Sequence, residues 1–185
     1  MKTEMESGLE AEKFGKILYE WADALVYALI FIVLLFTLIL RVTSVEGYSM
    51  EPTLYNNDTL ILSKLFYTPK RGDIVVITKT SFREEPIVKR IIAVGGQSVD
   101  IDFNRGIVYV DGVEQSEPYI NAPTQREGDM SFPLVVPEGF VFVMGDNRNN
   151  STDSRFSIIG LIDERMIMGR VLFRILPFDR IGTVG

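Results

Sequence analysis

Hydrophobic residues are distributed very unevenly along this 185-residue chain. The 17 residues from Ala24 to Leu40 carry no charge, whereas the rest of the chain alternates between short apolar runs and polar turns. Seventeen helical residues extend roughly 25 Å, close to the hydrocarbon core of a bilayer, which is about 30 Å thick. With its flanks, including Trp21 at the interface, this segment predicts a single transmembrane anchor over residues 21–43.

Two other interpretations of the apolar segment are a buried core helix and a cleavable secretory signal. A core helix in so small a domain would carry a polar face, which this segment lacks. Arg41 separates the apolar run from the small residues where a signal would be cut, which favours a retained anchor. Three lysines precede the segment and one arginine follows it closely, so the positive-inside rule places residues 1–20, a short amphipathic segment, in the cytoplasm.

Residues 44–185 show the pattern of a mainly β domain, in which short apolar or alternating runs are separated by turn residues. A strong hairpin signal, Asp111-Gly112, follows one of these runs. A short helix is expected over residues 162–166, and a mobile, irregular surface loop over 116–131. The expected strands cover residues 58–64, 73–79, 87–94, 107–110, 140–144 and 168–176.

Composition restricts the chemistry. The net charge of −6 argues against a nucleic-acid partner, because such proteins are usually basic. The chain has no cysteine and no histidine, which excludes thiolate nucleophiles, Ser-His-Asp triads and histidine-ligated zinc. No metal or organic cofactor is indicated. If a serine is activated here, lysine is the obvious base.

Lys89 is one candidate for that base. On a strand it shares a face with Ile87 and Ile91, while Arg90 points to the other face. Desolvation between isoleucines would lower the pKa of the Lys89 amine and let it accept a proton near neutral pH. The alternative is an edge-strand lysine whose stem carries the ammonium group to water.

Two further segments could hold chemistry. In the octapeptide GYSMEPTL, residues 47–54, a serine follows a glycine that allows close approach of a substrate, although an ordinary loop serine is the plainer interpretation. The run GDNRNNSTDSR, residues 145–155, directly follows an apolar strand. It is either a solvated loop or a braced site in which Asp153–Arg155 or Asp146–Arg148 pairs are buried.

Together these segments resemble the bacterial type I signal peptidase, or leader peptidase, family of Ser–Lys dyad proteases. GYSMEPTL, RGDIVV, VKRIIAVGG and GDNRNNSTDSR follow the family's boxes in order, behind an anchor. The resemblance covers nearly all of residues 17–175. It implies a largely antiparallel β catalytic domain with an apolar surface that rests on the bilayer.

The resemblance also implies roles for individual residues. Ser49 matches the nucleophile and Lys89 the general base, and the hydroxyl of Ser151 matches one that hydrogen-bonds the lysine amine. Asp153 and Arg155 match residues that hold the active-site loop, with Asp146 as a further support. Met50 matches a residue at the membrane-facing edge of the site. Pocket walls for small substrate side chains at positions −1 and −3 correspond to Leu54, Ile87 and Val88.

One position departs from part of the family. Some members carry a serine two residues before the nucleophile that helps to form the oxyanion hole, whereas this chain has Gly47. Glycine here, a single anchor and a short chain resemble the compact Gram-positive type. The endoplasmic reticulum branch uses histidine as base, and this chain has none.

The implied activity is removal of signal peptides after Ala-x-Ala-type sites through an acyl-enzyme. It would occur at the plasma membrane, with the catalytic domain outside the cytoplasm. The implied partners are exported preproteins and the lipid bilayer, with the secretion translocon as a further candidate. Two rival hypotheses are a self-cleaving repressor-type Ser–Lys protease, which would need a DNA-binding region, and a non-enzymatic anchored β module.

Overall fold

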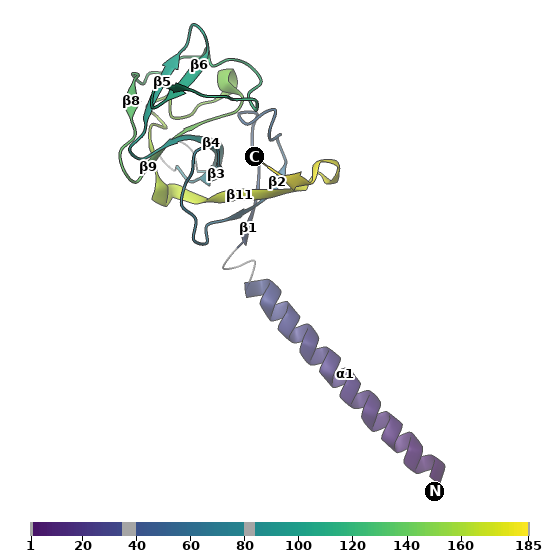
Figure 1. Ribbon diagram of the computed structural model, residues 1–185. Coiled ribbons are helices and arrows are strands. Elements are labelled where there is room, and N and C mark those ends of the chain that lie inside the picture. The colour runs from purple at the N-terminus through teal and green to yellow at the C-terminus, as the bar shows by residue number, and fades with distance from the viewer. Residues whose placement is uncertain (1, 35–39, 80–83, 185) are drawn as a thin grey trace. The chain divides into compact units, whose positions relative to one another are not determined.

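The computed structural model describes residues 2–34, 40–79 and 84–184. Two compact units divide at the end of the apolar segment: residues 1–40 form one and residues 41–185 the other. Figure 1 shows the helix of the first unit and the β domain of the second. The expected combination of one N-terminal helix and a mainly β domain is confirmed.

The first unit is a single helix, α1 (Lys2–Leu34). Its last 20 residues, Gly15–Leu34, have a mean hydropathy of 1.9 and are exposed throughout, so they are long and apolar enough to cross a bilayer. Residues 2–20 belong to the same helix and do not form a separate one.

The end of the expected anchor differs from the structure. Residues 35–39 lie outside the described residues, and Leu40–Ser44 form strand β1 where the sequence pattern predicted helix up to residue 43. The β-branched residues Val42 and Thr43 favour an extended chain, and β1 gains a hydrogen-bonded neighbour in β2.

An eight-stranded antiparallel sheet forms the body of the second unit. The strand order is β1-β2-β11-β3-β4-β9-β10, with β12 added beside β11. Several neighbours in this order are distant in sequence: β11 lies between β2 and β3, and β9 lies beside β4. Its further strands are β2 (Thr59–Ser63), β3 (Ile74–Ile77), β4 (Ile87–Val94), β9 (Phe140–Met144), β10 (Ile162–Asp163), β11 (Ile167–Leu176) and β12 (Gly182–Thr183).

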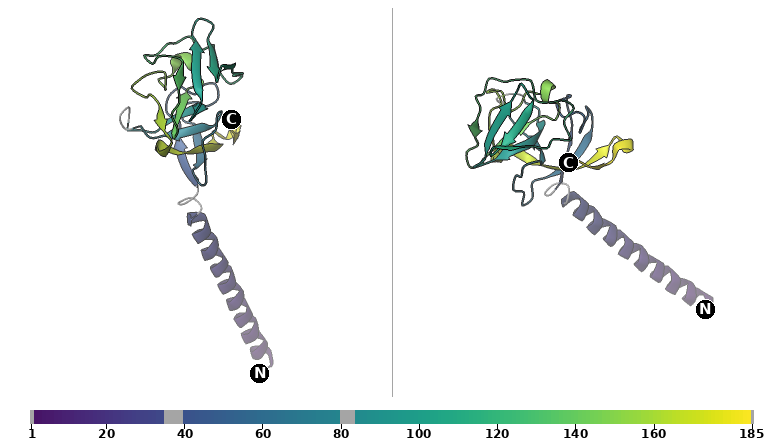
Figure 2. Two further views of the ribbon diagram at one scale, coloured as in Figure 1. Left: turned by 60° about the vertical axis from the view of Figure 1, so that its left-hand side comes forward. Right: turned by 45° about the horizontal axis from the view of Figure 1, so that its top comes forward.

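A smaller sheet of four strands, in the order β7-β6-β5-β8, completes the domain. In Figure 1 and in the left view of Figure 2 it lies at the end of the domain opposite to β1. The predicted hairpin is confirmed: Asp111 and Gly112 both have positive φ angles, 53° and 75°, as a tight β turn requires. The strands are β5 (Ser98–Asp102), β6 (Ile107–Val110), β7 (Val113–Glu114) and β8 (Leu134–Val135).

Strand β4 is the centre of the packing. Its residues are buried from Ile87 to Ala93, because the sheet is covered on both faces. Ile87 and Ile91 pack in one apolar cluster while Val88 packs in another, as the alternation of a strand requires. A charged side chain on this strand must therefore find its partner inside the protein.

The expected strands agree closely with the observed ones. Three match in their bounds, β4, β6 and β9, and three are shifted by one or two residues, β2, β3 and β11. The helix expected over residues 162–166 is only partly right, since Ile162–Asp163 is strand β10 and only Glu164–Met166 forms a 3-10 turn. Ile162 is fully buried and pairs with Val141, and this packing outweighs the helical preference of its neighbours.

Candidate active site

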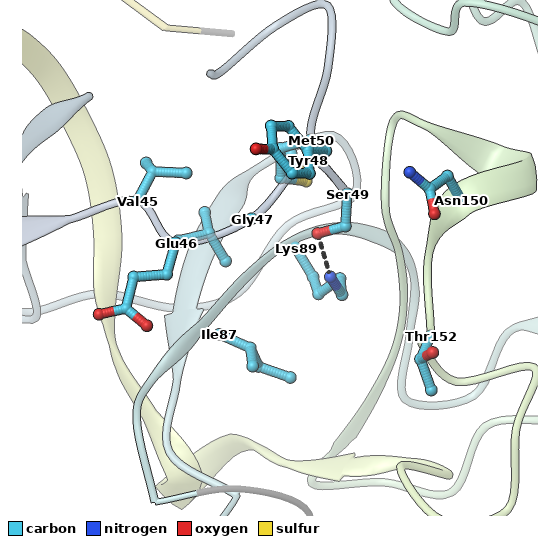
Figure 3. A pocket seen from close by; sticks show the side chains of 11 residues that line it. Val45, Glu46, Gly47, Tyr48, Ser49, Met50, Ile87, Lys89, Asn150 and Thr152 are labelled. Atoms are coloured by element: carbon cyan, nitrogen blue, oxygen red, sulfur yellow. Dashed lines mark hydrogen bonds between the residues drawn. The ribbon is translucent and has the colours of Figure 1, made fainter. Parts of the chain in front are cut away.

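Ser49 and Lys89 meet in the domain, although 40 residues separate them along the chain. Nζ of Lys89 donates a hydrogen bond to Oγ of Ser49 over 2.6 Å, as Figure 3 shows. The Lys89 side chain is buried, with only 4% of its surface exposed, whereas Ser49 is half-buried and reaches the cleft. The sequence-predicted nucleophile and base are therefore in direct contact.

Backbone contacts on both sides of the serine hold it. Gly47 has a φ of +92°, a conformation that favours glycine, and its N–H donates to Oδ1 of Asn56 over 2.9 Å. The carbonyl of Ser49 accepts the N–H of Asn147 over 3.0 Å. The side-chain amide of Asn147 donates to the carbonyl of Tyr48 over 3.1 Å. The segment around Ser49 is thus hydrogen-bonded to the loop that follows β9.

Lys89 is positioned by its strand. It pairs with Val75 of β3, and its face of β4 also carries Ile87 and Ile91. Arg90 points to the opposite face, where its Nε and Nη2 each donate to Asp146 over 2.8 Å. The predicted alternation of the two cationic side chains is therefore present, and the edge-strand alternative for Lys89 is wrong because β4 is an inner strand.

An open cleft of about 200 Å³ surrounds the dyad. Its apolar walls are β-branched, with Val45 on one side and Ile87 and Val88 from β4. Asn150 and Thr152 line the opposite side, as Figure 3 shows. Ile87 and Val88 thus line the cleft, as the pocket walls predicted from the sequence would.

Two other expected lining residues are placed differently. Met50 lines the cleft but is only 1% exposed, so it forms part of the core beneath the serine and not an exposed edge. Leu54 is fully buried in the same cluster as Met50 and is not among the lining residues of the cleft. The N–H of Leu54 bonds to the carbonyl of Met50 over 2.9 Å, and this turn directs both side chains inward.

The loop from Gly145 to Arg155 faces the dyad at very close range. A Cβ atom built on Gly145 would overlap the carbonyl oxygen of Ser49 and the hydroxyl of Ser151. Oγ of Ser151 is buried and has no hydrogen-bond partner among the residues that the structure describes. The expected bond from Ser151 to Lys89 is therefore not formed in this structure and stays a prediction.

Asp153 and Arg155 form the predicted buried pair. Nε and Nη2 of Arg155 donate to the two carboxylate oxygens of Asp153 over 2.8 and 2.9 Å, and both side chains are fully buried. Burial alone would raise the pKa of Asp153. The hydrogen bonds and charge of Arg155 and the N–H of Gly145 outweigh burial and hold this pKa below its usual range.

The other suggested pair, Asp146 with Arg148, is wrong. Asp146 binds Arg90, while the guanidinium of Arg148 binds both carboxylate oxygens of Glu117 over 2.7 and 2.6 Å. Arg148 is fully buried, so it needs a carboxylate that it can meet in two hydrogen bonds, and Glu117 supplies that geometry.

Sequence reasoning missed the function of the segment from 116 to 131. This segment has no helix or strand, as expected, but its side chains reach into the core of the site. Hydroxyl Oγ1 of Thr124 accepts from Arg148 over 2.9 Å, and the ring of Tyr119 lies 3.9 Å from the guanidinium carbon of Arg90. Burial raises the pKa of Tyr119 to about 12, so the ring stays neutral between the arginines. Only a covariation signal could have linked Glu117 to Arg148.

The described residues contain no cluster of acidic side chains that could hold a metal ion.

Comparison with known proteins decides the family. A model of the family described as signal peptidase, peptidase S26, matches residues 18–176. The chain belongs to this family. It is 38% identical over 172 residues to the probable signal peptidase I-1 of Synechocystis sp., a match that covers 87% of this chain and 84% of that protein. The signal peptidase I of Bacillus licheniformis is 36% identical, over 89% of this chain and 91% of the relative.

A solved structure, a signal peptidase I from Enterococcus faecalis, is also similar. Its sequence is 28% identical, its TM-score is 0.48, and the match covers 56% of this chain and 97% of that one. Membership of the S26 family makes the chain a peptidase. Its apolar N-terminal helix and the signal peptidase I relatives together indicate a membrane-anchored protein.

Gly145 offers a sharp test of the packing behind Ser49. Replacing it by alanine forces the Ser49 carbonyl or the Ser151 side chain to move. Since a displacement of about 1 Å in an active site can cost about 100-fold in rate, we expect a loss of peptidase activity of that order. The control is Gly182→Ala, where an added Cβ meets nothing within 4 Å. Equal activity of the two variants would contradict the close approach.

Two Asp-x-Arg pairs differ mainly in burial and form a matched test. We expect Asp153→Asn to lower the free energy of unfolding by about 3–5 kcal/mol, because Arg155 would remain buried and unpaired. Asp163→Asn should have little effect, because its partner Arg165 is 90% exposed. Thermal unfolding followed by circular dichroism in detergent measures both.

The stability that Asp153 contributes should depend on pH. The folded pKa of Asp153 is lowered, so its contribution to stability is complete above the unfolded value of about 3.9 and is lost as the pH falls through the folded pKa. In Asp153→Asn, the decrease in the free energy of unfolding at acid pH that comes from this carboxylate should disappear. An unchanged acid transition in that variant would show that other groups govern it.

Proposed function

We propose that this chain is a type I signal peptidase that cuts exported preproteins after small residues, with Ser49 as nucleophile and Lys89 as general base. The observation that carries the proposal is the 2.6 Å contact between the Lys89 amine and the Ser49 hydroxyl inside an open cleft with apolar walls on one side. The signal peptidase I relatives support the substrate class.

The substrate segment would enter the cleft as an extended chain beside β4. Side chains at positions −1 and −3 would face the walls formed by Val45, Ile87 and Val88. The branched side chains of these three residues would favour alanine-sized groups, which supports the Ala-x-Ala preference. Asn150 and Thr152 on the opposite side would face the rest of the substrate backbone.

Acylation begins when the neutral Lys89 amine takes the proton of the Ser49 hydroxyl and Oγ attacks the carbonyl carbon after position −1. The tetrahedral intermediate collapses, the peptide C–N bond breaks, and Lys89 returns the proton to the leaving amine of the mature protein. Water then gives a proton to Lys89 and attacks the ester, and Ser49 recovers its proton as the signal peptide leaves.

The negative oxygen of the intermediate needs donors. The backbone N–H of Ser49 is the first candidate. The N–H of Gly47 already donates to Asn56, so it does not serve as the second donor in this arrangement. A preorganised donor typically raises the rate by about 10²–10³. The absolute rate of this enzyme therefore depends on whether another protein group, or the substrate itself, provides the second hydrogen bond to the oxyanion.

The anchor would place this chemistry at the bilayer. Three lysines before the span and one arginine after it favour a cytoplasmic N-terminus and a catalytic domain on the extracytoplasmic side of the plasma membrane. Signal peptides are themselves membrane-bound, so an anchored peptidase meets them in two dimensions. Preproteins and lipid are therefore the proposed partners. The secretion translocon, which would deliver the preproteins, is a further proposed partner.

A reconstituted cleavage assay tests the function. The full chain in proteoliposomes should cut a preprotein with an Ala-x-Ala site, and Ser49→Ala and Lys89→Ala should each lose nearly all of this activity. Lys89→Arg should be equally inactive, because a guanidinium cannot act as base near neutral pH. A substrate with Phe at position −1 is the specificity control and should not be cut.

Circular dichroism shows whether the variants are folded. Full activity of Lys89→Arg, or cleavage of the Phe substrate at the wild-type rate, would contradict the base or the pocket. An inactive wild type would favour a non-enzymatic anchored module.

A further inference from the structure

The turn that follows the nucleophile has no helix or strand of its own. It runs from Met50 to Asp58, between Ser49 and the start of β2. Its apolar residues Met50 and Leu54 are buried, which fixes its depth in the domain. Two sets of side chains that are distant in sequence contact its polar groups, and the mechanism above uses neither set.

The first contact comes from the C-terminal strand β11. One nitrogen of Arg174, Nη1, donates to the carbonyl of Thr53 over 3.2 Å and to Oδ2 of Asp58 over 3.1 Å. Asp58 is fully buried, and its Oδ2 also accepts the N–H of Tyr55 over 3.0 Å. Arg180, whose Nη2 lies 3.1 Å from Oδ1 of Asp58, completes this group. Arg174 and Arg180 thus contact the turn at two residues, Thr53 and Asp58.

The second contact comes from the loop that faces the dyad. The hydroxyl of Thr53 donates to Oδ2 of Asp146 over 2.5 Å. The same carboxylate is held by two hydrogen bonds from Arg90, the neighbour of Lys89 on β4. A continuous chain of contacts therefore leads from Thr53 through Asp146 to the strand that carries the base.

We propose that Thr53 and Arg174 are positioning residues that clamp the nucleophile turn and so set the distance between Ser49 and Lys89. The proposal rests on the proposed function, because it assigns these residues a role in the same reaction. Thr53 is the point where the two contacts meet: Arg174 holds its carbonyl and Asp146 holds its hydroxyl. Neither residue lines the cleft, so both act through Ser49 and not on the substrate.

The kinetic consequence follows from the geometry. Two of the pocket walls, Ile87 and Val88, lie on β4 and make none of these contacts, whereas Val45 is hydrogen-bonded to Asn57 and Asp58 of the turn. Most of the substrate binding should therefore persist when the clamp is loosened. A turn free to shift by a fraction of an ångström would lengthen the 2.6 Å contact of the dyad, and misplacement of about 1 Å can cost about 100-fold. The loss should therefore appear in kcat, with KM little changed.

The experiment measures kcat and KM for the full chain in proteoliposomes with an Ala-x-Ala preprotein. We expect Thr53→Val and Arg174→Gln each to lower kcat by about 10- to 100-fold with KM within about twofold of wild type. Thr53→Ser keeps the hydroxyl and should restore most of kcat, as should Arg174→Lys, which keeps a charged donor near Asp58. Because both contacts act on one turn, the double variant should lose less than the product of the two single losses.

The matched control is Arg170→Gln. Arg170 lies on the same strand and is ion-paired with Asp73 over 3.2 Å, but it has no contact with the turn in this structure, and its side chain is 49% exposed. Its kcat should equal that of wild type. Thermal unfolding of every variant separates a kinetic defect from loss of the folded domain, and Thr53→Ser provides a folded comparison if Thr53→Val is unstable.

Each outcome decides the matter. Unchanged kcat in Thr53→Val and Arg174→Gln, or a loss that appears equally in Arg170→Gln, would overturn the clamp. A rise in KM at constant kcat would assign these residues to substrate binding instead. An inactive wild type would defeat the proposed function itself, whereas an active wild type with unaffected clamp variants would defeat only this inference.

Discussion

Burial of one lysine amine beside a serine hydroxyl is the constraint on which the site depends. Lys89 lies on the innermost part of the sheet, where an ammonium group is poorly solvated. The carboxylate of Asp153, on the facing loop, is matched by the guanidinium of Arg155. This local compensation lessens the pull of Asp153 on the Lys89 amine, which supports the proposed role of Lys89 as a base.

Three arginines are buried in the domain that holds the cleft. Arg90, Arg148 and Arg155 each meet a carboxylate in two hydrogen bonds, and Arg155 also donates to the carbonyl of Arg148 over 2.6 Å. Such pairs contribute little net stability when compared with apolar packing, but they are costly to break. Their effect is to fix the facing loop, including Gly145 against Ser49, in one arrangement.

The sequence predicted the parts of the fold that depend on local pattern. Strand β4 and the Asp111-Gly112 hairpin follow from alternation and turn chemistry, and the dyad follows from motifs whose residues the structure brings together. The sequence pattern does not show strand β5, because its acidic Asp100 makes the run weakly apolar. The family resemblance implied Leu54 as a pocket wall, whereas the turn directs its side chain into the core. The pairs Glu117–Arg148 and Asp58–Arg174 join residues more than 30 positions apart, and a single sequence holds no signal for them.

The most direct test of the central claim is the pH dependence of kcat/KM, which reports the pKa of the free enzyme's base. The full chain in proteoliposomes would be assayed from about pH 5 to 10.5 on an Ala-x-Ala preprotein. If Lys89 is a desolvated general base, kcat/KM rises with pH through a midpoint well below the usual lysine value of about 10.4. A rate that rises only near 10.4, or that shows no dependence on a basic group, would contradict the account.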